Sequence, residues 1–308
     1  MQLTLPNLPE KIKETLLNEA SQHALSDNLS GSGPQDLLES RALTLPIFVL
    51  LAVTPNPSKE QILFVHNFSV AMFSMWHSYT LLDGFLDGDF GAYEIIAMQG
   101  WTRIGDQYLE RMYREYPLMR KPMQKAFIKT EEYYRWEISD ARLDKKTITA
   151  ELNSKTSEKG GTPVICEHES QEKSLSVEDY NYIAVRMSAY LESLKQLVLY
   201  LGLDARIASQ IYKYFKNIII ADQLKDDLID WEDDLKRGIL TYVTGQIAEA
   251  GIRRSKQRNY FSTQVEPKVK KEIEQLLQKA AKVMSSIPDN SLNKELLLRP
   301  LNLGKSGE

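Results

Sequence analysis

Aspartates recur at a regular interval between residues 222 and 238, a stretch that reads DQLKDDLIDWEDDLKRG. Asp226, Asp230 and Asp234 are spaced four residues apart, and Asp222 lies one turn before them. Because an α-helix turns once in about 3.6 residues, this spacing stacks the carboxylates in one row along a helix. Like charges so spaced repel one another. The pattern therefore predicts either a solvated acidic face or a row of oxygen ligands for cations.

A second pair of carboxylates stands at the end of an apolar segment, where the chain reads LLDGFLDGD. Asp83 and Asp87 are also four residues apart, so they face the same way if a helix continues through Gly84. Taken alone, Asp and Gly at a helix end are typical of a turn. Together with the first row, the pair favours a common role in cation binding.

The acidic stretch resembles aspartate-rich motifs of the isoprenoid synthase superfamily. Its first part, Gln223-x-x-Asp226-Asp227-x-x-Asp230, is similar to the second such motif of polyprenyl diphosphate synthases. Its continuation is similar to the corresponding motif of squalene and phytoene synthases, which has an acidic pair and an Arg-Gly ending: Asp230-x-x-Asp233-Asp234-x-x-Arg237-Gly238.

The earlier cluster extends this resemblance. The segment from Asp83 to Asp87 resembles the Asp-Asp-x-x-Asp motif of prenyl synthases with Gly84 in its second position, and it matches the Asp-x-x-x-Asp spacing of squalene-type enzymes. Arg41, followed by ALTLPIFVLLA, is similar to the helix that begins prenyl synthase catalytic cores. The resemblance covers most of residues 40–240.

The resemblance implies an all-α fold: one isoprenoid synthase helical domain over residues 1–308, with a central active-site cavity. It implies Mg²⁺ as cofactor, in a cluster of about three ions that share a prenyl diphosphate. The catalytic residues it implies are Asp83, Asp87, Asp226 and Asp230, and the metal ligands are these four together with Asp234.

Basic side chains are expected to complete a diphosphate site, because guanidinium groups bind phosphate oxygens in bidentate fashion. Arg186 lies inside the otherwise apolar YNYIAVRMSAYL, and Lys225 lies within the acidic motif. The expected diphosphate-binding residues are Arg186, Lys225, Arg237 and Arg135, with Arg253, Arg254, Arg258 and Tyr260 as further candidates from the C-terminal side.

A dry pocket is expected beneath the carboxylates. Met72, Trp76 and Tyr79 precede Asp83 by one to three turns, and Phe215 and Ile219 precede Asp226 on a similar face. Aromatic faces can stabilise a nearby cation. The alternative is plain core packing, which the same apolar residues would also satisfy.

Composition describes an ordinary globular protein: 308 residues, 43% hydrophobic, 26% charged and a net charge of −4. Scattered Lys and Arg give no case for a nucleic-acid partner. One cysteine, Cys166, fits a reducing, cytoplasmic compartment, and no signal peptide is recognisable.

Residues 62–82 lack charge but carry several polar groups, so we expect a buried helix and no transmembrane segment. Many proteins that the chain resembles are homodimers.

Apolar periodicity predicts helices throughout the chain. We expect Ser58 to cap one helix and Pro46 to kink or restart another. His66 and His77 lie in an apolar segment and are expected to be core histidines. Residues 145–176 form a polar insertion that we expect to be mobile, and the tail from about 289 to 308 is expected to be poorly ordered. The predicted helices are 8–24, 41–53, 59–83, 90–115, 117–142, 178–202, 204–236, 240–256 and 265–286.

Three reactions fit such a site. Chain elongation is disfavoured, because the glycine-lysine-arginine stretch and the arginine pair of elongating synthases have no good match here. A class I terpene synthase, which ionises one prenyl diphosphate and releases diphosphate plus a hydrocarbon or alcohol, fits the altered first motif best. Head-to-head coupling of the squalene or phytoene type is the alternative, as is a non-catalytic subunit that binds an active partner.

Overall fold

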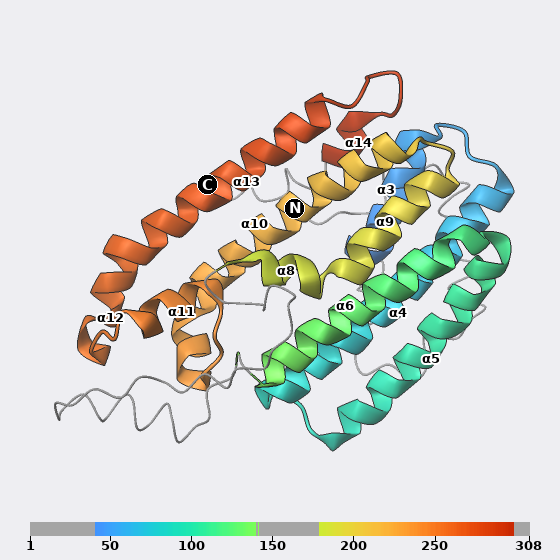
Figure 1. The fold of residues 1–308 in the computed structure, drawn as a ribbon. Coiled ribbons are helices and arrows are strands. Elements are labelled where there is room, and N and C mark those ends of the chain that lie inside the picture. Colours follow the sequence, from blue (N-terminus) through green and yellow to red (C-terminus); the bar gives the residue numbers. More distant parts are fainter. Residues whose placement is uncertain (1–40, 140, 142–178, 299–308) are drawn as a thin grey trace. The chain divides into compact units, whose positions relative to one another are not determined.

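The described part of the chain is built of helices and the turns and loops that join them (Figure 1). The computed structural model describes residues 41–139, 141 and 179–298, and these ranges contain no β-strand. The predicted all-α class is therefore confirmed. The chain divides into two compact units, described separately below: unit 1 comprises residues 1–123, 192–212 and 284–308, and unit 2 comprises residues 124–191 and 213–283. One domain with a central cavity stays a prediction.

Unit 1 is built around the pairing of two long helices, α4 (Lys59–Asp87) and α5 (Ala92–Glu115). Helix α3 (Arg41–Val53), which runs through Pro46 without a break, packs against α4. Helix α14 (Lys294–Leu298) packs against α3. The short 3₁₀ helix η2 (Pro117–Met119) follows α5.

Helix α4 begins where the sequence predicts and ends later. The backbone N–H of Gln61 donates to Ser58 Oγ at 3.3 Å, and the Gln61 side chain accepts from the Ser58 N–H at 2.9 Å, which closes a capping box. The helix continues through Gly84 and ends at Gly88, whose φ of 77° is the left-handed conformation that glycine adopts at little cost.

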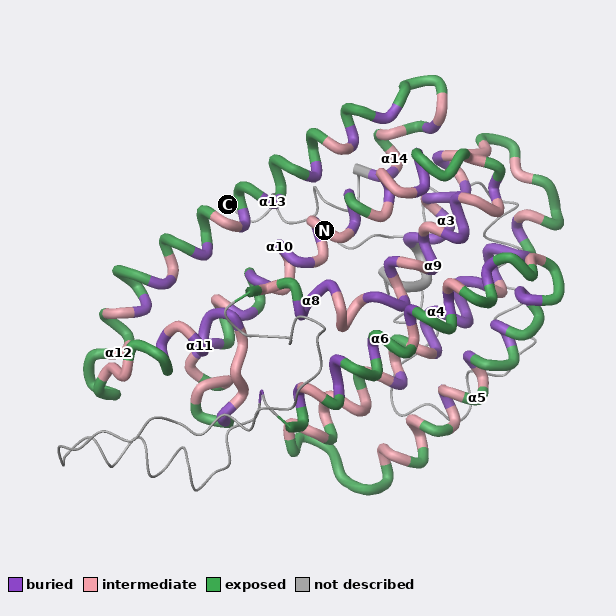
Figure 2. Tube along the Cα trace, in the orientation of Figure 1, coloured by how far each residue is buried: buried purple, intermediate pink, exposed green. Residues whose placement is uncertain are grey.

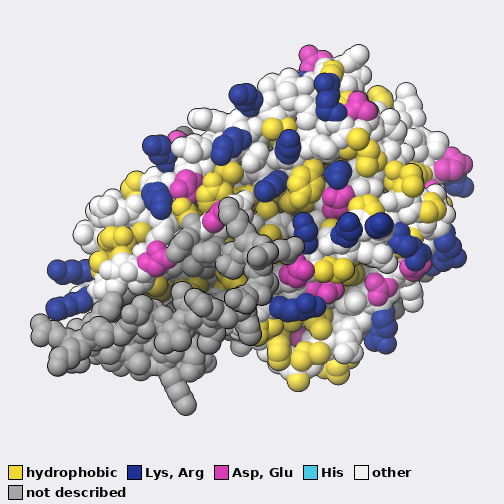
Figure 3. Space-filling model, viewed as in Figure 1, with side chains coloured by type: hydrophobic (Ala, Val, Ile, Leu, Met, Phe, Trp, Pro, Cys, Tyr) yellow, Lys and Arg dark blue, Asp and Glu magenta, His cyan; other side chains and the backbone are white. Residues whose placement is uncertain are grey.

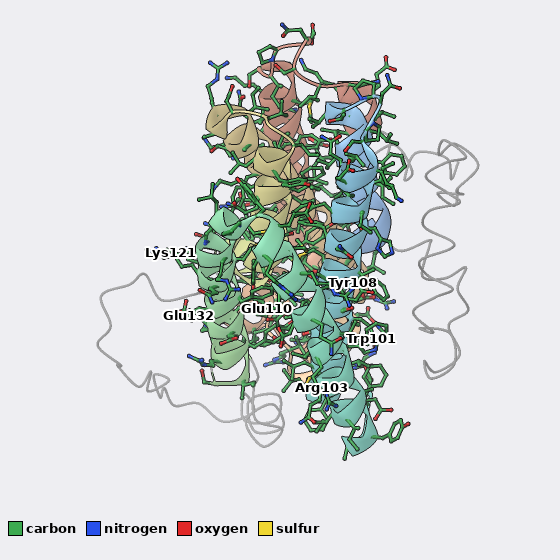
Figure 4. The ribbon with its side chains drawn as sticks, turned by 90° about the vertical axis from the view of Figure 1, so that its right-hand side faces the viewer. Trp101, Arg103, Tyr108, Glu110, Lys121 and Glu132 are labelled. Carbon is green, nitrogen blue, oxygen red and sulfur yellow. The ribbon has the colours of Figure 1, made fainter. Side chains whose placement is uncertain are left out.

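The N-terminal half of α4 is buried, as its charge-free sequence predicts, from Ile62 to Ser74 with few exceptions. Beyond Met75 most of its residues are only half-buried. Helix α5 approaches closely at Gly105, where a Cβ would lie 2.6 Å from the Met75 sulfur. Figure 4 labels Trp101, Tyr108 and Glu110 along α5.

Unit 2 contains the helices that carry the acidic row. Its elements are most of α6 (Arg120–Ser139), α8 (Asn181–Arg186), the first turn of α9 (Ser188–Tyr200), the larger part of α10 (Ala205–Arg237), α11 (Tyr242–Glu249), α12 (Arg254–Tyr260), the π-helical turn η3 (Phe261–Val265) and most of α13 (Glu266–Ser285). Along α13, exposed and buried residues alternate with the helical period (Figure 2).

Two predicted helices are interrupted. The helix expected over residues 178–202 breaks at Met187, between α8 and α9. Ser188 Oγ donates to the carbonyl of Ala184 at 3.1 Å, a back-bond that bends helices. The helix expected over residues 240–256 stops at Glu249, because Gly251 takes a φ of 59°.

The expectation of a poorly ordered tail is wrong for its first part. Residues 294–298 form α14, and Leu297 is completely buried because it packs in unit 1. The expected helix at 8–24, the insertion at 145–176 with Cys166, and residues 299–308 lie outside the described residues.

Within the described ranges, none of the helices combines the length and the apolar character needed to cross a bilayer. On the face of the molecule seen in Figure 3, basic and acidic side chains are interspersed.

Candidate functional site

The acidic row lies on one uninterrupted helix, since α10 runs from Ala205 to Arg237. The side chains of Asp226 and Asp230 are exposed, and Asp234 is half-buried. Two lysines relieve part of the repulsion within the stretch. Lys225 Nζ lies 2.8 Å from Asp222 Oδ1, and Lys236 Nζ lies 2.7 Å from Asp233 Oδ1.

Asp227 is the carboxylate of this stretch that the fold buries, with 3% of its surface exposed. Gln223, one turn earlier, donates from Nε2 to Asp227 Oδ1 at 2.9 Å. The other oxygen, Oδ2, is buried and accepts no hydrogen bond from the part of the chain that the structure describes. An unpartnered buried carboxylate oxygen costs free energy, so natural proteins retain few of them without a reason.

The pKa of Asp227 also distinguishes it from the other carboxylates of this stretch. Burial raises the pKa of the Asp227 carboxyl to about 7, and the negative charges of Asp234 and Asp226 act in the same direction. The hydrogen bond from Gln223 and the positive charge of Arg186 oppose this rise in pKa. Asp227 therefore lies among charges of both signs, in a place where water screens them poorly.

Arg186 is the predicted diphosphate ligand whose positive charge acts on this carboxylate. It ends helix α8, is half-buried, and holds its guanidinium carbon 5.8 Å from the centre of the Tyr133 ring. Tyr182, one turn earlier on α8, stacks on Tyr133 with ring centres 6.2 Å apart. Its hydroxyl accepts the backbone N–H of Tyr242 at 2.9 Å.

We call these side chains the Asp227 cluster: Asp227, Arg186, Tyr182 and Tyr133. They come from three helices of unit 2, namely α10, α8 and α6. The indole of Trp136 adds to it, 5.5 Å from the Tyr182 ring centre. Burial and the charge of Asp227 hold the pKa of Tyr182 well above its ordinary value. Sequence analysis missed Asp227, Tyr133 and Trp136 as site residues, although the adjacent acids of the motif and Gln223 at i−4 pointed to Asp227.

Two of the other basic candidates, Arg135 and Lys225, have ionic partners at the surface. Arg135 is exposed on α6 and lies 3.6 Å from Glu131. Lys225 binds Asp222, as described above, and Arg237 is the exposed last residue of α10.

On the C-terminal side, a contact joins α12 to the acidic helix. Arg258 Nε donates to Glu232 Oε1 at 2.9 Å, and the Phe261 ring stacks on Trp231 with centres 4.5 Å apart. Phe261 begins the π-helical turn η3, a type of turn that is frequent at functional sites.

The first acidic pair is helical, as the Asp-x-x-x-Asp spacing requires. Asp83 and Asp87 both lie on α4 and are half-buried. Between them, Gly84 is covered by the ring of Phe90, which a Cβ at residue 84 would overlap. This pair belongs to unit 1, whereas the acids of α10 belong to unit 2.

The predicted pocket residues differ in burial. Met72 and Phe215 are buried, with 3% of each exposed. Tyr79 and Ile219 are half-buried, and Trp76 is 41% exposed. Met72 and Phe215 are thus packed as core residues, while Trp76 keeps a large accessible surface for a residue of its type.

The donor set on these helices suits a hard cation. Carboxylate oxygens are the ligands that Mg²⁺ takes, usually one or two for each ion, and the exposed Asp226 and Asp230 leave room for its waters. In the described ranges no group of three or more His, Cys, Asp or Glu side chains is already gathered around a metal position.

Comparison with known proteins adds no assignment. No model of a known protein family matches the chain, and no curated protein matches its sequence.

Proposed function

We propose that the chain is a Mg²⁺-dependent class I terpene synthase, which ionises one prenyl diphosphate and releases diphosphate together with a terpene hydrocarbon or alcohol. The proposal includes a cytoplasmic location and a homodimer, as expected from the cysteine content and the resemblance. No nucleic-acid partner is part of it.

The observation that carries the proposal is the arrangement on α10. Within three turns, this helix carries Asp226, Asp230 and Asp234 in one row and buries Asp227, on whose carboxyl the positive charge of Arg186 acts. A row of repelling acids lowers stability in the absence of cations, so its presence on a long helix favours a cation-binding role. The charge of Arg186 beside the acids suits a ligand that brings both metal and phosphate.

Each group has a role that follows from its chemistry. Asp226, Asp230 and Asp234 on α10 would hold Mg²⁺, which when bound supplies positive charge to the departing diphosphate. Asp83 and Asp87 on α4 stay predicted Mg²⁺ ligands. Arg186 would bind phosphate oxygens through its planar N–H groups. Trp76 and Tyr79, which lie two turns and one turn before Asp83, would present aromatic faces to the prenyl chain and exclude water.

A second candidate is head-to-head coupling of two prenyl diphosphates, as in squalene and phytoene synthases. The observation that favours it is the helical Asp83 and Asp87 pair, since Asp-x-x-x-Asp is the spacing that resembles those enzymes. The Phe90 ring packs over Gly84 where a Cβ would lie, and this packing explains why residue 84 is a glycine. Gly84 therefore no longer argues for a non-catalytic subunit.

The test is incubation of the purified protein with Mg²⁺ and, separately, geranyl, farnesyl, geranylgeranyl and longer diphosphates, with mass spectrometry of the products. We expect a hydrocarbon or alcohol from one substrate alone. Asp230→Asn should reduce the rate at least 100-fold, as loss of a group that stabilises a transition state does. Asp233→Asn is the matched control, because Asp233 is exposed on the same helix and bound to Lys236.

The other outcomes separate the alternatives. A product with twice the carbons of the substrate would establish head-to-head coupling. A longer diphosphate that forms only when isopentenyl diphosphate is added would establish elongation. No product from any substrate, with folded protein, would refute both catalytic candidates and leave the partner subunit.

A further inference from the structure

The turn between α5 and α6 concentrates positive charge in a protein whose net charge is −4. Residues 110–129 include six Lys or Arg residues and two acidic residues. Figure 4 labels Lys121 at the start of α6, where its side chain points outward. Five exposed residues of unit 1 lie at this turn, and we call them the basic corner: Arg111, Arg114, Leu118, Arg120 and Lys121.

Neighbouring side chains hold two arginines of the basic corner in place. Arg120 Nη2 lies 2.7 Å from Glu110 Oε2, and the Arg120 guanidinium carbon is 4.9 Å from the centre of the Tyr113 ring. The guanidinium carbon of Arg111 lies over the Tyr108 ring, 4.8 Å from its centre. Cations held in this way lose little side-chain freedom when they bind a partner.

Most of the positive charge of the basic corner is not neutralised. Within the described residues, Arg111, Arg114 and Lys121 form no ion pair with a carboxylate. Glu115, the second acidic residue of the stretch, accepts a hydrogen bond from the Tyr200 hydroxyl at 2.7 Å. Uncompensated cations on one exposed surface produce a positive potential, which attracts an anionic partner.

Leu118 lies between the arginines of α5 and the cations of α6, with 75% of its surface exposed. It belongs to the turn η2, between Pro117, whose ring fixes the backbone φ, and Met119, which is completely buried. Because Met119 anchors the turn in the core, Leu118 is held outward. One leucine on a short turn offers little apolar area for a stable protein interface, which buries about 800 Å² on each partner.

We propose that the basic corner docks on an anionic phospholipid surface: Leu118 enters the boundary between headgroups and acyl chains, and the four cations contact the phosphates around it. Basic side chains near an anionic membrane add to its affinity, and a buried apolar side chain adds to it separately. A nucleic acid fits less well, because Tyr108 and Tyr113 are buried under the arginines and cannot stack on bases. The docking requires neither Mg²⁺ nor diphosphate, so it is independent of the proposed function.

Co-sedimentation with lipid vesicles tests this docking without any substrate. The purified wild-type protein is mixed with vesicles of phosphatidylcholine alone, or of phosphatidylcholine with phosphatidylglycerol, and the bound fraction is measured at rising NaCl concentration. We expect binding to the anionic vesicles only, and weaker binding at higher salt, because salt screens exposed charges. Lys121→Gln should weaken the partition about fivefold, the contribution of one basic residue near an anionic surface. Leu118→Ala should also weaken it about fivefold.

Two variants are matched controls for these substitutions. Lys279→Gln removes an exposed lysine from α13, and Ile96→Ala removes exposed aliphatic surface from the first half of α5. Neither control should change the partition. All four side chains are exposed, so we expect the four variants to fold like the wild type, which circular dichroism checks.

Four results would overturn the proposal. Equal binding to neutral and anionic vesicles would exclude recognition of charge, and no binding to either kind would exclude a lipid partner. A loss in Lys279→Gln as large as that in Lys121→Gln would mean that total charge, and not the basic corner, drives binding. Full binding by Leu118→Ala would mean that Leu118 does not enter the bilayer.

Discussion

At the scale of single residues, the acidic stretch of α10 contains side chains in different environments despite their common charge. Asp226 and Asp230 face solvent, Asp222 and Asp233 bind lysines, and Asp227 is buried. Since like residues one position apart on a helix point about 100° away from each other, adjacent acids of one motif can serve different ends.

Gly84 provides a test of packing at the first acidic pair. A methyl group at this position would overlap the Phe90 ring, whereas alanine otherwise favours a helix over glycine by about 0.5 to 1 kcal/mol. We expect Gly84→Ala to stabilise a Phe90→Ala background by about that amount and to give no gain with Phe90 present. Denaturant unfolding of the four proteins measures this difference, and an equal gain in both backgrounds would contradict it.

His77 predicts a pH dependence of stability. Burial lowers the pKa of this imidazole, which packs between Phe73 and Trp101. In the unfolded chain the imidazole takes up a proton near pH 6.5, whereas in the folded protein it stays neutral to a lower pH. The contribution of neutral His77 to stability is therefore fully present above about pH 6.5 and is lost as the pH falls below this value. The Tm should therefore fall more from pH 7.5 to 5.5 in the wild type than in His77→Phe. Equal falls in the two proteins would refute the role of His77.

At the scale of elements, local signals were enough to place most helices. The predicted helix at 41–53 agrees with α3, and that at 204–236 agrees with α10 to within one residue at each end. The capping box at Ser58 fixes the start of α4. These boundaries depend on contacts within a few residues, which a sequence pattern contains.

The Ser58 cap should contribute measurably to the stability of the protein. Ser58→Ala removes the acceptor for the Gln61 N–H, so the protein should lose about 1 kcal/mol of stability. Ser58→Asp keeps an acceptor oxygen at the same place and adds a negative charge at the helix N-terminus, so it should stay close to the wild type. Urea unfolding of the three proteins checks this order, and equal losses in both variants would show that the cap contributes nothing.

The breaks between helices were not predictable in the same way. At Met187 the chain bends where Ser188 bonds back to Ala184, and serine occupies many straight helices without doing so. The break separates Arg186 from α9 and leaves α8 as a short helix fixed mainly by Tyr182. Local propensity thus identified the helical segment but not its division.

At the scale of the whole molecule, the proposed function predicts ligand-dependent stability. A ligand that binds only the folded protein stabilises it by about 2.7 kcal/mol at 100 times its Kd. We expect Mg²⁺ with inorganic diphosphate to raise the Tm of the wild type, and removal of Mg²⁺ by a chelator to reverse this. Asp230→Asn should show a smaller shift, and Asp233→Asn the full one.

The control is the same measurement with diphosphate alone. The acids of α10 repel diphosphate when no cation is bound, so we expect little stabilisation without Mg²⁺. A full shift without the metal would indicate a simple anion site on the basic side chains, and it would count against the terpene synthase.

The sequence alone determined the all-α class, most helix boundaries and the placement of the acids on α4 and α10, because helical period and caps are local properties. It could not determine which face of α10 is buried. A stripe through Asp226 and Asp230 and a stripe through Gln223 and Asp227 fit the same period equally well. Only the tertiary packing of unit 2 buries Asp227. The same packing brings the positive charge of Arg186, which is distant in sequence, close enough to act on its carboxyl.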